Sequence, residues 1–188
     1  IKLLLVDDHH IMLAGLKNLL KSASGIEIVG EASSGEEGIR LADEQEPDVV
    51  LMDIKMEGMN GLEATREILH RHSKMRVLIL TACNDDVFPI RLLREGACGY
   101  ITKDCSAEEV VKAIRAVYAG ERYIMPQIAQ RLALCRFSIN EETPFDSLSE
   151  RELQVVLMIT SDAKKAMQIA KDLSLSPKTV NTYRYRIF

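Results

Sequence analysis

The stretch Leu3-Leu4-Leu5-Val6-Asp7-Asp8 sets the pattern of the first 120 residues, because a short and continuous apolar run ends there in carboxylates. The runs Val49–Met52 and Val77–Leu80 have the same character, and Ile26–Val29 and Gly99–Ile101 are weaker versions. Uninterrupted apolar runs of this length are typical of strands that are buried on both faces of a parallel sheet. We therefore predict five parallel strands.

Amphipathic segments separate these predicted strands. Apolar residues recur at helical spacing between Met12 and Leu20 and between Val110 and Val117. The segments Ser34–Glu37 and Ser106–Glu109 match capping boxes, which begin helices. Five β/α repeats with right-handed crossovers predict an α/β fold with a doubly wound five-stranded parallel sheet. Such sheets bind ligands outside the carboxyl ends of their strands.

The overall composition is that of a soluble globular protein, with 47% hydrophobic and 28% charged residues. No apolar run is long enough to span a bilayer, and no export signal is evident, so we expect a cytoplasmic protein with no membrane contact. The four cysteines lie far apart, without the spacing of a zinc site.

Charge is distributed unevenly along the chain. Residues 1–144 carry 17 basic and 23 acidic side chains, whereas residues 145–188 carry 7 and 5. Within the second segment, residues 164–188 hold six Lys or Arg against the single Asp172. An acidic first part and a basic end indicate nucleic-acid binding at the end.

Polar side chains follow four of the predicted strands. Asp7 and Asp8 follow the first strand and Asp53 the third, so the three carboxylates should meet at one edge of the sheet, where they repel one another. Mg²⁺ prefers such oxygen ligands and would relieve the repulsion. Thr81 ends the fourth strand and Lys103 follows the fifth. Together these groups can accept and hold a phosphoryl group.

Any one of these residues alone is more often an ordinary surface group at a loop. Five of them at the correct strand ends are much harder to attribute to coincidence. An enzyme with an aspartyl nucleophile, a phosphatase or phosphotransferase, is the alternative for this pocket. Enzymes similar to the haloacid dehalogenases place a DxD pair after the first strand, whereas here Asp7 and Asp8 are adjacent and Asp53 stands alone.

Over residues 1–119 the chain resembles the receiver domains of two-component response regulators, which are flavodoxin-like. Four segments carry the resemblance: Val6–Asp8, Leu51–Asp53, Leu80–Ala82 and Gly99–Lys103. The resemblance implies the following roles: Asp53 as phosphoacceptor; Asp7, Asp8, Asp53 and the main-chain carbonyl of Lys55 as Mg²⁺ ligands; Thr81 as switch hydroxyl; Tyr100 as switch aromatic; and Lys103 as the cation that pairs with phosphate. Tyr100 is expected to rotate inward from an outward position on phosphorylation.

The chain departs from the receiver pattern at two positions. Glu57 stands where receivers usually have proline after the phosphorylated aspartate, and Asp104 stands where many have proline after the lysine. Neither departure removes a reacting group. The first leaves the shape and charge of the loop after Asp53 in doubt.

Residues 120–146 read as a linker, because Pro126, Pro144 and the polar stretch Ser138–Thr143 interrupt the pattern, although Ile128–Leu134 fits a short helix. Residues 147–188 then predict a small all-α domain. Three helices are expected in it. The first begins at a capping box of Ser149 and Glu152 and has Leu153, Val156 and Leu157 on one face. The second lies near Lys164–Leu173, and the third begins at Pro177 with Ser176 as its cap. Such an arrangement fits a helix-turn-helix.

This second segment resembles the helix-turn-helix of LuxR/NarL-type regulators through Leu148–Leu153 and Leu175–Val180. Arg122–Ile124, Ile128–Gln130, Pro144-Phe145 and Tyr183–Arg186 are similar to the GacA/UvrY/LetA subgroup. The resemblance implies a recognition helix from Pro177 in the major groove. Asn181, Thr182 and Tyr185 would face base edges, and Lys178, Thr179, Arg184 and Arg186 would meet phosphates. A solvated helix face is the plainer alternative for the basic residues.

The second segment also departs from its family. The stretch Ser161–Met167 lacks the expected glycine, and the sequence stops at Phe188, inside the expected recognition helix. A C-terminally truncated domain without the fourth, dimerising helix is therefore expected.

These observations together predict a two-component response regulator and transcription factor, not a multiple-turnover enzyme. A sensor histidine kinase or phosphotransfer domain would phosphorylate it, and the phosphorylated protein would bind double-stranded DNA as a homodimer. A regulator that has lost DNA binding and works through protein contacts remains the other alternative.

Overall fold

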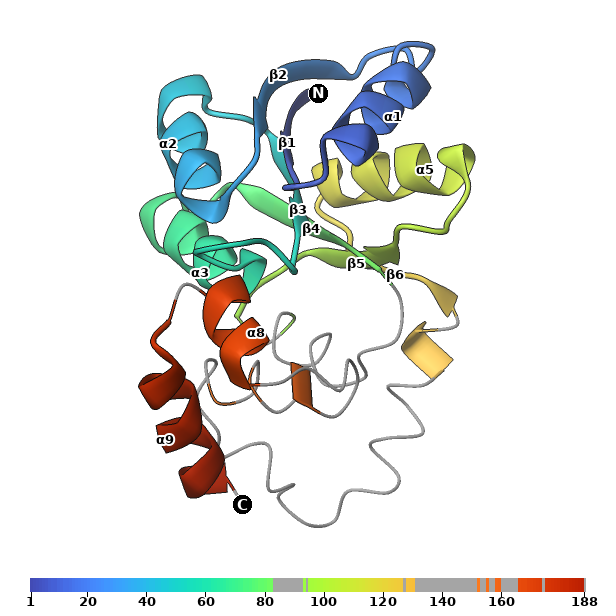
Figure 1. Cartoon of the computed structure of the whole chain (residues 1–188). Helices are drawn as coiled ribbons and strands as arrows, with labels where there is room; N and C mark the ends of the chain where they lie inside the picture. The colour runs from blue at the N-terminus through green and yellow to red at the C-terminus, as the bar shows by residue number, and fades with distance from the viewer. Residues whose placement is uncertain are drawn as a thin grey trace. The chain divides into compact units, whose positions relative to one another are not determined.

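A six-stranded parallel sheet forms the centre of the first 130 residues in the computed structural model (Figure 1). The order is β2-β1-β3-β4-β5-β6, so the chain reverses direction across the sheet after β2. The predicted doubly wound α/β fold is confirmed. The strands are β1 (Lys2–Val6), β2 (Glu27–Ala32), β3 (Val49–Asp53), β4 (Arg76–Thr81), β5 (Gly99–Thr102) and β6 (Tyr123–Ile124).

The structure describes residues 1–82, 93, 95–126, 128–130, 152, 155, 158–159, 166–173 and 175–187, and side chains as far as Arg184. The chain divides into two compact units, residues 1–133 and residues 134–188. Among the described residues, no helix combines the length and the apolar character needed to cross a membrane.

Helices cover both faces of the sheet, and the interiors of the central strands β1, β3 and β4 are apolar and buried. Figure 1 shows α1 (His10–Leu20) and α5 (Ala107–Tyr118) on one side and α2 (Gly35–Gln45) and α3 (Gly61–Arg71) on the other. Because side chains alternate along a strand, Leu3 and Leu5 of β1 pack with α1 and α5 in one core cluster, whereas Val6 lies against Gly38 of α2.

Side-chain caps fix where the helices begin. Ser34 and Ser106 accept hydrogen bonds from the backbone N–H groups three residues later, as predicted. The reciprocal half of each capping box is absent, because the Glu37 carboxylate bonds Ser33 and the Glu109 carboxylate bonds Tyr123. Asn60 caps α3 by accepting hydrogen bonds from the N–H groups of Leu62 and Glu63.

The sheet has six strands where five were predicted, and the sixth, β6, lies within residues 120–146, the predicted linker. Tyr123 N–H donates to the Cys98 carbonyl at 3.0 Å, and Met125 N–H donates to the Tyr100 carbonyl at 3.3 Å. The Tyr123 hydroxyl donates to Glu109 of α5, and Lys112 lies 5.6 Å from the centre of the Tyr123 ring. The segment after α5 therefore returns to the sheet beside β5.

A short helical segment follows β6. Pro126 and residues 128–130 are helical, which agrees with the beginning of the predicted helix at Ile128–Leu134, and Ile128 is buried. The remainder of that predicted helix lies outside the described residues.

The second unit is built from short helices. Its described helices include α8 (Ala166–Asp172) and α9 (Pro177–Ile187). Ile169 of α8, Leu173 just after it and Val180 of α9 are buried and pack with Val155. Ser176 caps α9 as predicted, because Thr179 N–H donates to its hydroxyl at 3.0 Å. Ser149, Leu153, Val156, Leu157 and most of Ser161–Met167 lie outside the described residues.

Gly99→Ala should detach β6 from the sheet. A Cβ at Gly99 would lie 2.6 Å from the Tyr123 carbonyl oxygen and 2.8 Å from Leu78 Cδ1, both closer than side-chain carbons approach. Overpacking of this kind costs about 1–3 kcal/mol, so the amides of Tyr123 and Met125 should exchange with solvent roughly 5- to 150-fold faster.

Hydrogen exchange measured by NMR tests this expectation at single amides. Gly15→Ala is the matched control, because a Cβ there meets nothing within 4 Å. Unchanged exchange at Tyr123 and Met125 in Gly99→Ala would show that β6 is not held by close packing against β5.

Candidate functional site

Strand register brings the predicted polar residues to one edge of the sheet. Val6 pairs with Met52, so Asp7 comes level with Asp53 at the end of β3. Leu80 lies beside Asp53, and Thr81 follows it at the end of β4. The two carboxylates are nearly inaccessible, with Asp7 1% and Asp53 2% exposed. The structure thus brings together the side chains that sequence order placed at separate strand ends.

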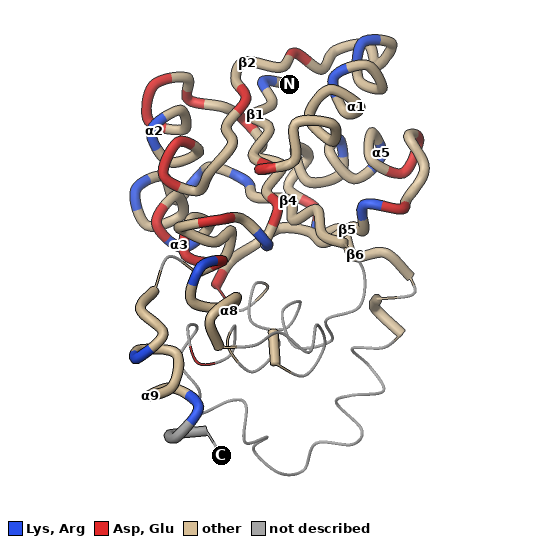
Figure 2. Tube along the Cα trace, in the orientation of Figure 1, with Lys and Arg blue, Asp and Glu red and all other residues tan. Residues whose placement is uncertain are grey.

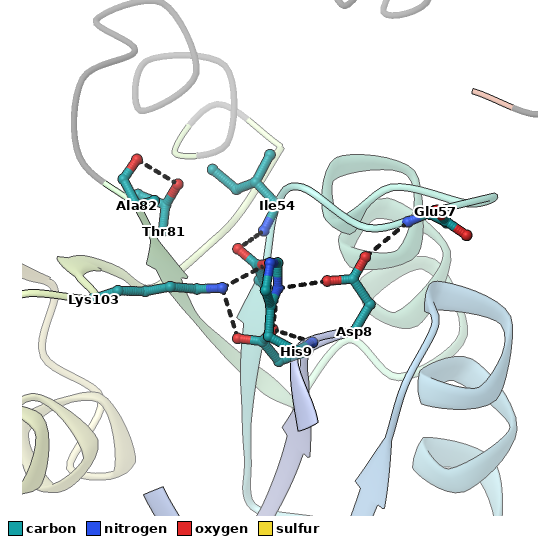
Figure 3. Close-up of polar contacts among 9 residues, drawn as sticks. Asp8, His9, Ile54, Glu57, Thr81, Ala82 and Lys103 are labelled. Atoms are coloured by element: carbon teal, nitrogen blue, oxygen red, sulfur yellow. Dashed lines mark hydrogen bonds and ion pairs between the residues drawn. The ribbon is translucent and has the colours of Figure 1, made fainter. Parts of the chain in front are cut away.

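Lys103 is the cation that holds these buried carboxylates (Figure 3). Its Nζ lies 2.8 Å from Asp53 Oδ2 and 2.7 Å from Asp7 Oδ2. The Lys103 N–H donates to the Thr81 carbonyl at 2.7 Å, which fixes the base of the side chain at the end of β5. Burial acts to lower the pKa of Lys103, but the bonds to both carboxylates outweigh burial and raise it.

Burial raises the pKa of Asp53 to about 6, and the nearby charge of Asp7 acts in the same direction. Hydrogen bonds from Lys103 and from the Ile54 N–H, 2.8 Å from Asp53 Oδ1, oppose this rise without cancelling it. The Asp53 carboxylate is therefore costly to ionise in the absence of further positive charge.

Gly61 permits the backbone to pass close to Asp53. A Cβ at Gly61 would lie 1.9 Å from the Asp53 carbonyl oxygen, so no larger residue fits while α3 begins at this point. The Gly61 N–H donates to the Ile54 carbonyl at 3.0 Å and ties the start of α3 to the loop after β3. The loop that carries the predicted metal ligands is thereby anchored at both ends.

A divalent cation fits the carboxylate cluster. Asp7, Asp8, His9 and Asp53 each offer one ligand atom, and these atoms all lie within 4.8 Å of one another. Opposite ligands of a Mg²⁺ ion are about 4.2 Å apart, given bonds of about 2.1 Å. Asp7, Asp8 and Asp53 were predicted as ligands, whereas His9 was assigned no role. The signal for His9 was its position directly after the two aspartates.

Two of the predicted positions lie in the loop after β3. Lys55 is exposed there, and the role of its main-chain carbonyl as a ligand stays a prediction. Glu57, which replaces the expected proline, donates its N–H to Asp8 Oδ2 at 3.1 Å (Figure 3). Proline has no N–H to donate, so this departure from the family gives Asp8 an additional hydrogen bond. Asp104, the other departure, is exposed in the turn after β5.

Both predicted switch residues are buried in this structure. Thr81 is 3% exposed, and its hydroxyl makes a long contact of 3.5 Å with the Ala82 carbonyl (Figure 3). Tyr100 is also 3% exposed, and the rotation of its ring between an outward and an inward position stays a prediction.

The described part of α9 has one buried face and one exposed face. Val180 is fully buried, and Tyr183 packs partly against the same core. Lys178, Asn181, Thr182 and Arg184 are exposed, Thr179 is half-buried with its hydroxyl against Ser176, and the side chains of Tyr185 and Arg186 lie outside the described residues. The helix carries Lys and Arg but neither Asp nor Glu (Figure 2).

Comparisons with known proteins match both units. Residues 3–115 match the response regulator receiver domain family, and residues 146–188 match the luxR family of bacterial regulatory proteins. The chain is 53% identical to the response regulator GacA of Pseudomonas aeruginosa over 100% of its own length and 88% of that protein. It is 47% identical to the response regulator UvrY of Escherichia coli, with coverage of 100% and 86%.

A solved structure supports the same assignment. A LuxR-family two-component response regulator from Aurantimonas superposes with a TM-score of 0.69 and 39% identity. The superposition covers 72% of this chain and 97% of that one.

Asp53→Asn should stabilise the protein at neutral pH when divalent ions are removed. The pKa of Asp53 is about 6 in the folded state against 3.8 for the ordinary group, so the folded state binds the proton more tightly. The contribution of Asp53 to stability is therefore greatest below pH 3.8 and is lost as the pH rises through 6. At about 1.4 kcal/mol per pKa unit, ionised Asp53 costs up to about 3 kcal/mol at pH 7.5.

Urea unfolding in EDTA at pH 7.5 and pH 5 measures this difference. Asp53→Asn should be more stable than the unsubstituted protein by about 1–3 kcal/mol at pH 7.5, with a smaller gap at pH 5. The exposed Asp104→Asn is the control for loss of a surface charge. A gap of equal size at both pH values would assign the stabilisation to something other than ionisation of Asp53.

Proposed function

This chain belongs to the LuxR-family response regulators, with a receiver domain followed by a LuxR-type DNA-binding domain, and we propose that phosphorylation of Asp53 switches its binding to DNA. The family consists of transcriptional regulators and not of multiple-turnover enzymes, which removes the phosphatase alternative. A receiver implies a histidine kinase as partner, and the second domain implies DNA.

For the domain boundaries we propose a receiver at residues 1–119, a linker at 120–146 and a DNA-binding domain at 147–188. The family matches at residues 3–115 and 146–188 support these limits. The first part of this linker joins the receiver sheet as β6, so the free length between the two domains is shorter than the sequence indicates.

The observation that carries the proposal is the placement of Asp53 against Lys103 at the edge of the sheet. An Asp53 oxygen attacks the phosphorus of a phosphohistidine; the P–N bond breaks, an acyl phosphate forms, and the imidazole leaves. Lys103 already lies 2.8 Å from Asp53 Oδ2, where it can pair with the new phosphoryl oxygens.

Mg²⁺ would be held by Asp7, Asp8, Asp53 and the main-chain carbonyl of Lys55, and it would neutralise the charge of the incoming phosphoryl group. The cluster of ligand atoms within 4.8 Å supports this assignment. Without added positive charge, three carboxylates and a dianionic phosphoryl group would repel one another.

The switch would act through Thr81 and Tyr100. A phosphoryl oxygen on Asp53 would accept a hydrogen bond from the Thr81 hydroxyl, which in this structure makes a long contact with the Ala82 carbonyl. The inward position of Tyr100 is then the one that phosphorylation favours, because a ligand shifts a protein toward the state that it binds better. The Tyr100 carbonyl accepts the Met125 N–H, so this switch lies next to the beginning of the linker.

The exposed face of α9 would read DNA as part of a homodimer. Asn181, Thr182 and Tyr185 face base edges, and Lys178, Thr179, Arg184 and Arg186 contact phosphates. Exposure of Lys178, Asn181 and Thr182 on the side of the helix away from the buried Val180 supports this division, and Arg184 is exposed as well. The Thr182 hydroxyl donates to the Lys178 carbonyl at 3.0 Å, which leaves its oxygen lone pairs and methyl group for DNA.

Labelling with radioactive acetyl phosphate tests the phosphoacceptor. The unsubstituted protein and the Asp104→Asn control should be labelled in Mg²⁺ and not in EDTA, and Asp53→Asn should lose nearly all label because its amide is not a nucleophile. Full labelling of Asp53→Asn would place the acceptor on another residue.

DNA titrations in a series of salt concentrations test the two classes of contact on α9, with a site selected from a random pool by the unsubstituted protein. Asn181→Ala should lose about 1–3 kcal/mol on the selected site and little on random DNA. Lys178→Ala should weaken binding to both DNAs and lower the salt slope by about 1.

Lys74→Ala, a charge removed from the exposed surface of the receiver, is the control. Equal losses for Asn181→Ala on selected and random DNA would mean that Asn181 reads no base.

A further inference from the structure

His9 brings an imidazole nitrogen into the carboxylate cluster of the receiver (Figure 3). Its Nδ1 lies 3.0 Å from Asp7 Oδ1 and 2.7 Å from Asp8 Oδ1, and within 4.8 Å of an oxygen of Asp53. A single ring nitrogen thus lies against two carboxylates and close to a third. The cluster therefore offers a metal ion one nitrogen ligand as well as carboxylate oxygen ligands.

The backbone fixes His9 at this position. Its N–H donates to Asp7 Oδ1 at 2.9 Å, and its carbonyl accepts the N–H groups of Met12 and Leu13 at 2.9 and 3.1 Å. His9 is the N-cap residue of α1, yet its side chain makes no capping hydrogen bond. The ring is therefore not needed to begin the helix, and 65% of the side chain is open to solvent, from which an ion can enter.

Both carboxylates also have a basic nitrogen as a neighbour. Asp7 Oδ2 forms an ion pair with Lys103 Nζ at 2.7 Å, and Asp8 Oδ1 lies 2.7 Å from His9 Nδ1. The other oxygen of Asp8 is already bound by the Glu57 N–H. Asp7 Oδ1 and Asp8 Oδ1 both face His9 Nδ1, so a cation bound at this point would have two carboxylate oxygens and one ring nitrogen within reach.

We propose that His9 Nδ1 is a ligand of the divalent cation and that it shifts the preference of the pocket from Mg²⁺ toward first-row transition ions such as Co²⁺. This inference rests on the proposed function, because it concerns the same cation site. Mg²⁺ takes oxygen ligands in strict octahedral geometry, whereas imidazole nitrogen suits transition ions. Nδ1 is the ring nitrogen of His9 that faces the carboxylates, so it is the atom placed to bind the ion.

Dissociation constants for Co²⁺ and Mg²⁺, measured by calorimetry on the full chain, test the proposal. Removing the nitrogen in His9→Ala should weaken Co²⁺ binding by about 10-fold or more and Mg²⁺ binding by less than about 3-fold. His9→Asn, which keeps a good N-cap residue and offers an oxygen, should lower the ratio of Co²⁺ to Mg²⁺ affinity in the same direction. His10→Ala is the matched control, because His10 is exposed and outside the cluster.

Proton NMR of the Co²⁺ form gives a second readout that does not depend on affinity. A cobalt-bound imidazole has a strongly shifted ring N–H resonance, which should be present in the unsubstituted protein and in His10→Ala and absent in His9→Ala. A resonance that persists in His9→Ala would overturn the assignment. Tighter Co²⁺ binding by His9→Ala would also overturn it, because the ring would then exclude the ion and not ligate it.

Phosphorylation of the unsubstituted protein in Mg²⁺ is scored separately. If Asp53 is labelled while His9→Ala keeps the original ratio of ion affinities, the inference about His9 fails and the proposed function stands. If Asp53 is not labelled, the proposed function fails, and the affinity ratio and the NMR resonance still decide whether His9 is a ligand.

Discussion

The bridge from Lys103 to Asp7 and Asp53 is the interaction on which the receiver edge depends. The parallel register brings two carboxylates side by side at the ends of β1 and β3, and the surrounding apolar strands remove the water that would separate their charges. One ammonium group at 2.7 and 2.8 Å balances part of that repulsion. Burial is the main cause of the raised pKa of Asp53, with the charge of Asp7 acting in the same direction, and the negative charge that remains fits a divalent cation.

Features with a local signal were predictable from sequence. Continuous apolar runs identified β1, β3 and β4, and the pair Ser176-Pro177 marked the start of α9, because strand burial and helix capping depend on neighbouring residues. Asp7, Asp53 and Lys103 were placed correctly at one edge, since topology alone sets where parallel strands end. The resemblance to known families then added roles that composition and spacing do not reveal.

The rest depends on contacts between residues far apart in sequence. β6 has only two residues, and it exists because the carbonyls of β5 and the Glu109 side chain are within its reach. The bond from Glu57 to Asp8 uses a backbone N–H, for which the sequence carries no sign beyond the missing proline. The burial of Tyr100 likewise depends on residues that pack around it from other parts of the chain.

The two outer strands of the sheet also influence whether this chain aggregates at high protein concentration. An exposed strand edge presents unpaired N–H and C=O groups to which another molecule can add a strand, the first step of many aggregates. β6 covers the edge of β5 with a strand too short to extend far, and β2 has Glu27 and Glu31 exposed and a register shift against β1. Such edges are poor templates for added strands, so they disfavour pairing of this sheet with strands of other molecules.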